Sequence, residues 1–315
     1  MCASRGTADA EAFARSILGK TYKYAPAMEM QALSNTLWAM GKMGIKLPDL
    51  EPLRPHLVKV LEDRMRELMA REGLTESRSA EQLWYGLSHT RYGWDLDLLR
   101  SMVRQTVQDM AGWEDVKNVF TTCQSLTLLT KAYGIRISKD DRDRLTAILS
   151  DKVSTADETV LANNAGNVLT TAKVLALRLD VPTVKVLHDS GLAMPLLLAC
   201  ERGVIGLSGI LYDSIKLGYH PAPAEAQLWC QRLLEDLPEK QRTTQDAQSW
   251  VFVALSSCRS LTPSPELKAQ LKALAEALPN AIRAGTAIRT LQACRAWGVD
   301  LAPTTAKRLG RLAVV

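Results

Sequence analysis

The chain has 315 residues, of which 47% are hydrophobic and 23% charged, with a formal net charge of +5. This composition excludes a disordered chain, and the longest apolar run, residues 191–200, contains Pro195 and is too short to span a bilayer. A single hydrophobic core stops growing at roughly 250–300 residues, so we expect two domains or a repeat array. The mild basic excess permits a nucleic-acid partner without requiring one.

The first 27 residues are predicted to form an N-terminal extension or a capping helix. They contain Arg, Lys, Ser and Ala, which also suggests a weak targeting segment, although Asp9 and Glu11 are unusual in such segments. The remainder, 28–315, is rich in Leu, Ala, Arg, Lys, Glu and Gln, which favours helix throughout. We therefore predict a helical repeat over 28–315.

The first repeat unit is clearest in residues 33–48, LSNTLWAMGKMGIKLP. Leu33, Leu37 and Met40 follow the spacing of one helix face. Gly44 is suited to the left-handed residue that often ends a helix, and Pro48 cannot continue one. This pattern predicts a helix over 28–43 with a defined stop.

The same pattern recurs in residues 207–221, LSGILYDSIKLGYHP. The aligned pairs are Leu33 with Leu207, Ser34 with Ser208, Leu37 with Leu211, Trp38 with Tyr212, Lys42 with Lys216, and Gly44 with Gly218. Two such similar stretches so far apart indicate an internal repeat.

Helix pairs are predicted along the whole chain, each made of a motif helix and a partner helix. The motif helices are expected at 28–43, 78–92, 114–133, 158–179, 204–217, 244–259 and 279–297. The partners are expected at 51–70, 96–110, 139–153, 183–201, 222–235 and 265–277, with a short helix after Pro303. The residues that end the motif helices, spaced by roughly 38–49 positions, are Gly44, Gly93, Gly134, Asp180, Gly218, Ser260 and Gly298.

One helix pair of this length cannot bury its apolar face alone, so the pairs must stack. The predicted fold class is therefore all-α, an α-α superhelix (solenoid) of about seven helix-turn-helix repeats. No HExxH, GxSxG or CxxC motif occurs, and the six cysteines and four histidines are scattered. We therefore expect buried, reduced cysteines, no metal site, no cofactor, no small-molecule substrate and no enzymatic activity.

The segment LSNTLWAMGKMG resembles the octotricopeptide repeat of organelle RNA-binding proteins in algae and related protists. It is also similar to the helical repeats of FAST-kinase-like and RAP-domain proteins. The resemblance implies an α-solenoid that binds single-stranded RNA in a mitochondrial matrix or chloroplast stroma. The chain departs from these families because it lacks their proline-rich PPPEW-like segment, of which HPAP, LTPSP and DLAP are partial counterparts, and it contains no RAP-type domain.

Every repeat carries a basic residue close to the end of its motif helix, and we call these residues the basic series. They are Lys42, Arg91, Lys131, Arg178, Lys216, Arg259 and Arg295. One hypothesis is that they contact the phosphates of an RNA backbone. Alternatively, a cation in the last turn offsets the negative end of the helix by about 0.3–1 kcal/mol and needs no ligand, or the series forms a protein-binding edge.

A second set of polar residues is proposed to read bases, because helical-repeat proteins recognise single bases with side chains that vary between repeats. These are Asn35, Gln124, Asn167, Ser208, Gln248 and Arg289. The alternative is ordinary solvated helix surface. The aromatic residues Trp38, Trp84, Tyr212, Trp250 and Trp297 border the apolar stripe, which favours packing between repeats over base stacking.

The sequence therefore predicts an RNA-binding helical-repeat protein of an organelle, with single-stranded or ribosomal RNA as the partner. A second hypothesis is a structural subunit of an organellar ribosome or another large assembly, in contact with ribosomal or other organellar proteins. A third is an armadillo-like protein–protein scaffold in the cytoplasm. None of the three involves membrane insertion.

Overall fold

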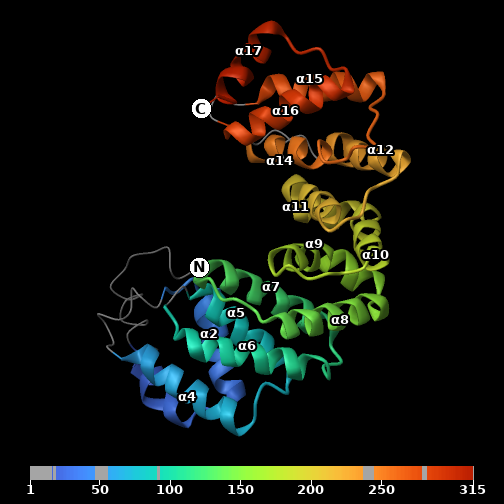
Figure 1. Ribbon diagram of the computed structural model, residues 1–315. Helices are drawn as coiled ribbons and strands as arrows, with labels where there is room; N and C mark the ends of the chain where they lie inside the picture. The colour runs from blue at the N-terminus through green and yellow to red at the C-terminus, as the bar shows by residue number, and fades with distance from the viewer. Residues whose placement is uncertain are drawn as a thin grey trace. The chain divides into compact units, whose positions relative to one another are not determined.

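The computed structural model describes residues 16, 19–46, 56–90, 93–236, 245–278 and 282–314. Over these ranges the chain is built from helices and contains no strand (Figure 1), which confirms the predicted all-α helical-repeat class. The chain divides into two compact units. Unit 1 comprises Met1–Lys152 with Val174–Leu177, and unit 2 comprises Val153–Lys173 with Arg178–Val315.

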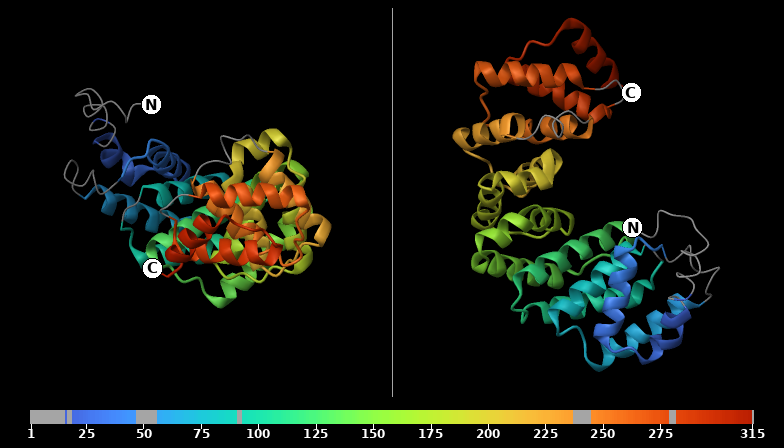
Figure 2. Two further views of the ribbon diagram at one scale, coloured as in Figure 1. Left: turned by 90° about the horizontal axis from the view of Figure 1, so that it is seen from above. Right: turned by 180° about the vertical axis from the view of Figure 1, so that it is seen from behind.

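In unit 1 the helices alternate between a motif layer and a partner layer. The motif helices are α2 (Met30–Lys42), α5 (Ser77–His89) and α7 (Val116–Tyr133); the partners are α4 (Leu57–Arg71), α6 (Leu96–Met110) and α8 (Lys139–Thr155), and the short η2 (Ala25–Ala27) precedes α2. Figures 1 and 2 show α2, α5 and α7 side by side, and α2 packs on α5 and α5 on α7. Helices α2 and α5 thus each bury one face against the next motif helix, as the repeat requires.

Contacts within the motif layer, and between it and the partner layer, explain which helix faces of unit 1 are buried. Leu33 and Leu37 are fully buried on α2, and Gly86 of α5 packs so closely on Leu37 that it has no room for a side chain. Trp84 is also fully buried, and its indole N–H donates to Oγ1 of Thr106 in α6 at 2.9 Å. This hydrogen bond satisfies the only polar atom of a large core side chain and joins a motif helix to its partner.

Unit 2 follows the same order of motif and partner helices. Its helices are α9 (Glu158–Val174), α10 (Val181–Leu192), α11 (Leu196–Lys216), α12 (Pro223–Gln231), α14 (Gln245–Leu255), α15 (Pro265–Ala277), α16 (Ala284–Trp297) and α17 (Pro303–Leu312), with a π-turn (η3) at Arg232–Asp236. Helix α11 packs on α10 and α14, α14 packs on α16, and α16 packs on α15 and α17. Gly203, with φ of 69°, interrupts α11 one residue before the predicted start of the motif helix at 204.

The glycine stop signals are confirmed where the structure describes them. Gly134 and Gly298 are the left-handed C-caps of α7 and α16, both with φ of 63°. Gly44 (φ 68°) and Gly218 (φ 98°) take left-handed backbone just after α2 and α11. Glycine adopts this conformation without the steric cost that a Cβ atom imposes.

Three predicted ends of motif helices are wrong, and the partner helix predicted at 183–201 ends at Leu192, with α11 starting at Leu196. Helix α9 ends at Val174, and Asp180 instead caps α10, where its side chain accepts from the amide of Thr183. An Asp before Pro182 suits a helix start as well as a helix stop, and here the start is realised. Helix α14 ends at Leu255 instead of 259, and α5 ends at His89 instead of 92.

The described cysteines Cys123, Cys230, Cys258 and Cys294 are buried, as predicted. Burial raises the pKa of Cys123 and Cys258 to about 12 and that of Cys294 to about 11. Within the described ranges no three His, Cys, Asp or Glu side chains are placed to hold a metal ion. No described helix has the length and apolarity that a bilayer crossing demands.

Candidate nucleic-acid interface

Three cationic groups surround the ring of Tyr212, a half-buried residue of α11. The Nζ atoms of Lys216 and Lys173 each lie 5.4 Å from the ring centroid, and Cζ of Arg289 lies 5.8 Å from it. These side chains come from α11, α9 and α16. The fold of unit 2 therefore gathers positive charge from three helices around one aromatic side chain.

Only one of these cations is neutralised by a described carboxylate. Asp213 has 4% of its side chain exposed, forms an ion pair with Lys173, and accepts a hydrogen bond from Oγ1 of Thr170 at 2.8 Å. Within the part of the chain that the structure describes, Lys216 and Arg289 have no acidic partner within ion-pair distance. Two positive charges at Tyr212 are thus available to an external anion.

A pocket of about 500 Å³ adjoins this cluster, and we call it the basic pocket. Its charged lining residues are Lys216, Arg259 and Arg289, and no acidic residue is among the described residues that line it. The other lining residues are Ser256, Ser257, Cys258, Leu261, Thr262, Gln292, Ala293, Ala296 and Trp297. The volume lies within the roughly 300–1,000 Å³ of small-molecule sites.

Helix-end electrostatics account for only part of this arrangement. Lys216 lies in the last turn of α11, where a cation offsets the negative end of the helix. Arg259 lies four residues beyond the end of α14, and Arg289 lies near the middle of α16. The helix dipole acts mainly within the last turn, so it gives no reason for a cation at Arg289.

An exposed aromatic side chain borders the same cluster. Trp250 of α14 is 38% exposed, and its ring meets the Tyr212 ring edge-on, with centroids 6.3 Å apart and an interplanar angle of 78°. Exposed aromatic rings are surfaces on which bases of single-stranded nucleic acids stack. The neighbourhood of Tyr212 therefore offers both cations for phosphates and a ring for a base.

The matching repeat in unit 1 has a smaller version of this arrangement. Lys42 Nζ lies 5.5 Å from the centroid of the Trp38 ring and 4.5 Å from that of Tyr85, which is stacked on His89. Glu81 is half-buried nearby, and burial raises the pKa of its carboxyl even though Lys42 acts in the opposite direction. A lysine one turn after an aromatic residue is thus common to both repeats, but among the described residues Trp38 and Tyr85 have one cation over their rings, whereas Tyr212 has three.

The other members of the basic series lie at separate places. Lys131 and Arg295 are exposed in the last turns of α7 and α16, and Arg178 is exposed in the connection after α9. Arg91 lies outside the described residues. The expected position in the last helical turn is therefore wrong for Arg178 and Arg259, because α9 and α14 end earlier than predicted.

The proposed base-reading residues divide by burial. Asn35 and Gln124 are exposed, and Asn167 and Arg289 are half-buried. Ser208 and Gln248 are buried, so they do not reach a surface where a base could contact them. Among the aromatic residues, Trp84 and Trp297 are buried in the core, whereas Trp38, Tyr212 and Trp250 retain exposed surface.

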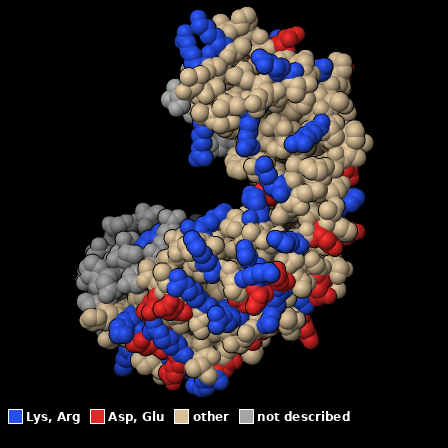
Figure 3. Space-filling view, in the orientation of Figure 1, with Lys and Arg blue, Asp and Glu red and all other residues tan. Residues whose placement is uncertain are grey.

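The charge distribution differs between the units on the face shown in Figure 3. Over unit 1, Lys and Arg side chains alternate with Asp and Glu, whereas the part that holds α14–α17 shows several basic groups and few acidic ones. From residue 245 to the end of the chain, basic residues clearly outnumber acidic ones. Such an excess attracts anions at long range.

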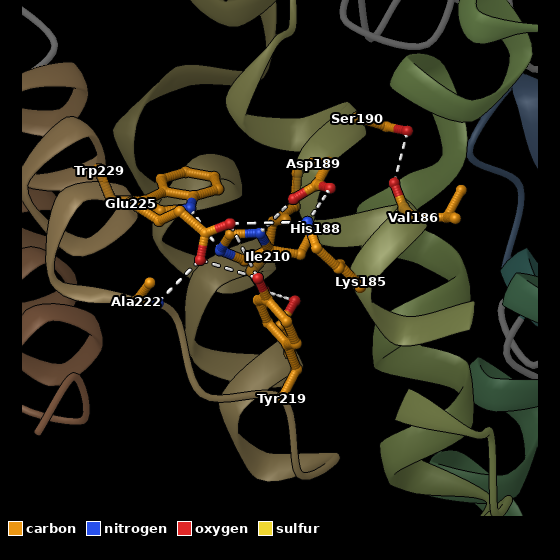
Figure 4. Close-up of polar contacts among 11 residues, drawn as sticks. Lys185, Val186, His188, Asp189, Ser190, Ile210, Tyr219, Ala222, Glu225 and Trp229 are labelled. Carbon is orange, nitrogen blue, oxygen red and sulfur yellow. Dashed lines mark hydrogen bonds and ion pairs between the residues drawn. The ribbon is translucent and has the colours of Figure 1, made fainter. Parts of the chain in front are cut away.

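Sequence reasoning missed a polar network on α10 that lies outside both predicted sets. Figure 4 shows the Trp229 indole and the Asp189 carboxylate converging on His188. Nε2 of the fully buried His188 accepts from Nε1 of Trp229 at 2.7 Å, so Nδ1 carries the hydrogen that is donated to Oδ1 of Asp189 at 3.1 Å. Burial lowers the pKa of His188 and keeps the ring neutral.

The same network holds the loop after α11. The Tyr219 hydroxyl contacts both Glu225 carboxylate oxygens, at 3.0 and 2.8 Å, and one of them accepts from the amide of Ala222. Lys185 lies 2.5 Å from Asp189 and 3.6 Å from Glu225. Burial and the hydrogen bond to Glu225 raise the pKa of Tyr219 to about 12.

A further hydrogen bond links this loop to the basic pocket. Oγ of Ser260 donates to the carbonyl oxygen of Pro221 at 2.6 Å, and Ser260 directly follows Arg259. Both ring nitrogens of His188 are engaged within the protein, so the network is suited to positioning and not to proton transfer. No sequence motif indicated it, because His188 and Trp229 are 41 residues apart.

No protein-family model matches the chain, and no curated protein is similar enough to give a match.

Proposed function

We propose that this protein binds RNA in an organelle, through the basic and aromatic side chains of its motif helices, and that it does so without catalysis. The observation that carries the proposal is the basic pocket beside Tyr212 and Trp250. Its three cations neutralise phosphates, and the exposed ring of Trp250 stacks on a base of a single-stranded segment. The resemblance of residues 33–44 to organellar RNA-binding repeats supports the mitochondrial or chloroplast location.

The two units contribute differently to this binding. Lys42, between the rings of Trp38 and Tyr85, contacts one phosphate, and unit 2 supplies the larger share of positive charge. Neutralised phosphates release counterions, so each contact adds about 0.7 to the slope of log K against log salt for single strands. The slope of log K against log salt therefore gives the number of phosphates that the protein contacts.

The test measures binding of a fluorescent single-stranded RNA to the full chain at several salt concentrations. The double variant Lys216→Ala/Arg259→Ala should weaken binding and lower the slope by about 1.4. The matched control Lys139→Ala/Lys272→Ala removes two exposed lysines from the partner helices α8 and α15 and should change the slope little. Absence of RNA binding, or equal slopes for both double variants, would overturn the proposal.

Crosslinking in cells followed by sequencing of the bound RNA identifies the target. Recovery of one messenger RNA supports a transcript-specific factor, and recovery of organellar ribosomal RNA supports a ribosome-bound role. Recovery of cytosolic RNA alone would contradict the organellar location.

A further inference from the structure

The basic pocket holds more positive charge than an internal RNA phosphate requires. An internal phosphodiester carries one negative charge, whereas a terminal phosphomonoester carries about −1.5 to −2 at pH 7 and offers three acceptor oxygens. Lys216, Arg259 and Arg289 line the pocket without a described acidic residue among them. We propose that the pocket binds a terminal phosphomonoester of the RNA, an inference that rests on the proposed function.

The donor types fit this ligand. A guanidinium presents a planar fork of N–H donors that matches phosphate oxygens in pairs, and a lysine adds a compact charge. Arg259 and Arg289 supply two such forks and Lys216 supplies the ammonium. Arg289 projects from the middle of α16 and Lys216 from the last turn of α11, so both are carried by helices.

The charge of the cluster is unbalanced without an anion. Lys216 and Arg289 lie 5.4 and 5.8 Å from the same ring centroid and line the same pocket, so two like charges share one site. Asp213 does not relieve them, because it is buried and paired with Lys173. A dianionic group between Lys216 and Arg289 removes this repulsion, whereas a monoanion removes only part of it.

The size and walls of the pocket suit the end of a strand. About 500 Å³ accommodates a ligand of small-molecule size, and the buried side chains of Cys258, Leu261 and Trp297 line it. Lys216 lines the pocket and lies over the ring of Tyr212, which meets the ring of Trp250 edge-on. The terminal base stacks on Trp250. The corresponding Lys42 of unit 1 has Glu81 nearby and suits an internal phosphodiester.

The experiment compares one RNA sequence in three forms: 5′-phosphate, 3′-phosphate, and hydroxyl at both ends. Each carries an internal fluorophore, and binding to the full chain is measured by anisotropy at pH 7.5. One phosphorylated form should bind at least about tenfold more tightly than the hydroxyl form. The preference should shrink at pH 5, below the second phosphate pKa of about 6.

Variants separate the end site from general RNA binding. Arg289→Gln should abolish the preference for the phosphorylated end and weaken the binding of hydroxyl-ended RNA by a smaller factor, and Arg289→Lys should restore part of the preference. Lys42→Ala should weaken all forms by the same factor. Circular dichroism checks that each variant is folded.

Competition with adenosine monophosphate distinguishes the two sources of a phosphomonoester. Weak competition assigns the pocket to an RNA end, and competition at the affinity of the phosphorylated RNA assigns it to a mononucleotide. Equal affinity of all three RNA forms overturns the inference and leaves the proposed function intact. Binding of the monophosphate without binding of any RNA overturns the proposed function and, with it, the assignment of the pocket to an RNA end.

Discussion

Gly86 of α5 lies directly against the backbone of Leu37 in α2. A Cβ atom added at Gly86 would stand 2.5 Å from the carbonyl carbon of Leu37, which is closer than non-bonded carbon atoms approach. The contact sets how closely the first two motif helices of unit 1 pack.

Gly86→Ala should therefore destabilise the protein by about 1–3 kcal/mol, because the added methyl group overpacks the helix interface. The matched control is Gly209→Ala in α11, where no atom lies within 4 Å of the added Cβ. There the higher helix propensity of alanine should add about 0.5–1 kcal/mol. Urea denaturation measures both; a neutral or stabilising effect at Gly86 would contradict the close packing.

Because His188 is neutral in the folded protein, we expect the free energy of unfolding to depend on pH. Burial lowers its pKa below 6.5, so the unfolded chain binds the proton more readily than the folded chain does. The contribution of His188 to the free energy of unfolding is complete above about pH 6.5 and is lost as the pH falls towards the lowered pKa. Asp189, Lys185, Glu225 and Tyr219 face the ring but do not reverse this direction.

The measurement is the free energy of unfolding at pH 7.5, 6.5 and 5.5. His188→Gln should flatten the decline between pH 6.5 and 5.5, whereas His220→Gln, at an exposed histidine of the same unit, should leave it unchanged. If the profile of His188→Gln matches that of the unaltered protein, another group is responsible for the decline.

Asp213→Asn is expected to lower stability and strengthen RNA binding. The buried carboxylate loses its pairing with Lys173, which should cost about 1–3 kcal/mol. The released Lys173 becomes available to RNA, so the salt slope should steepen by about 0.7. Asp300→Asn, at an exposed residue, controls for the change in net charge, and an unaltered slope in Asp213→Asn would contradict the expected release.

Trp250→Leu should weaken RNA binding by about 1–3 kcal/mol, because one base loses its stacking partner. Stability should change little, since the side chain is 38% exposed. Leu228→Ala on α12, which truncates another exposed apolar side chain, is the comparison variant. Anisotropy and quenching of tryptophan fluorescence report binding; equal affinity of the two variants would exclude stacking at Trp250.

Local signals in the sequence predicted the helices and most of their ends. Gly44, Gly134, Gly218 and Gly298 were predictable because glycine tolerates left-handed backbone after an apolar helix face. The end of α9 was not predictable, because Asp180, two residues before Pro182, is compatible with either a helix stop or a helix start. In the structure the start is realised, because the Asp180 side chain caps α10.

The basic pocket was not predictable as a unit. Lys216 and Arg259 were assigned to phosphates and Arg289 to bases, because spacing along the chain says nothing about which helices meet. Likewise, the hydrogen bond between His188 and Trp229 joins positions on α10 and α12 that share no sequence pattern. Such contacts arise from packing between elements and leave no local signature.

The packing of motif helices on their neighbours also has an evolutionary consequence. The motif helices α2, α5 and α7 of unit 1 pack on one another in succession, and so do α11, α14 and α16 of unit 2. Gain or loss of one helix pair therefore rebuilds a single interface and leaves the others untouched. Under the proposed function, duplication or deletion of a gene segment would change the number of nucleotides that the protein spans, without redesign of the remaining core.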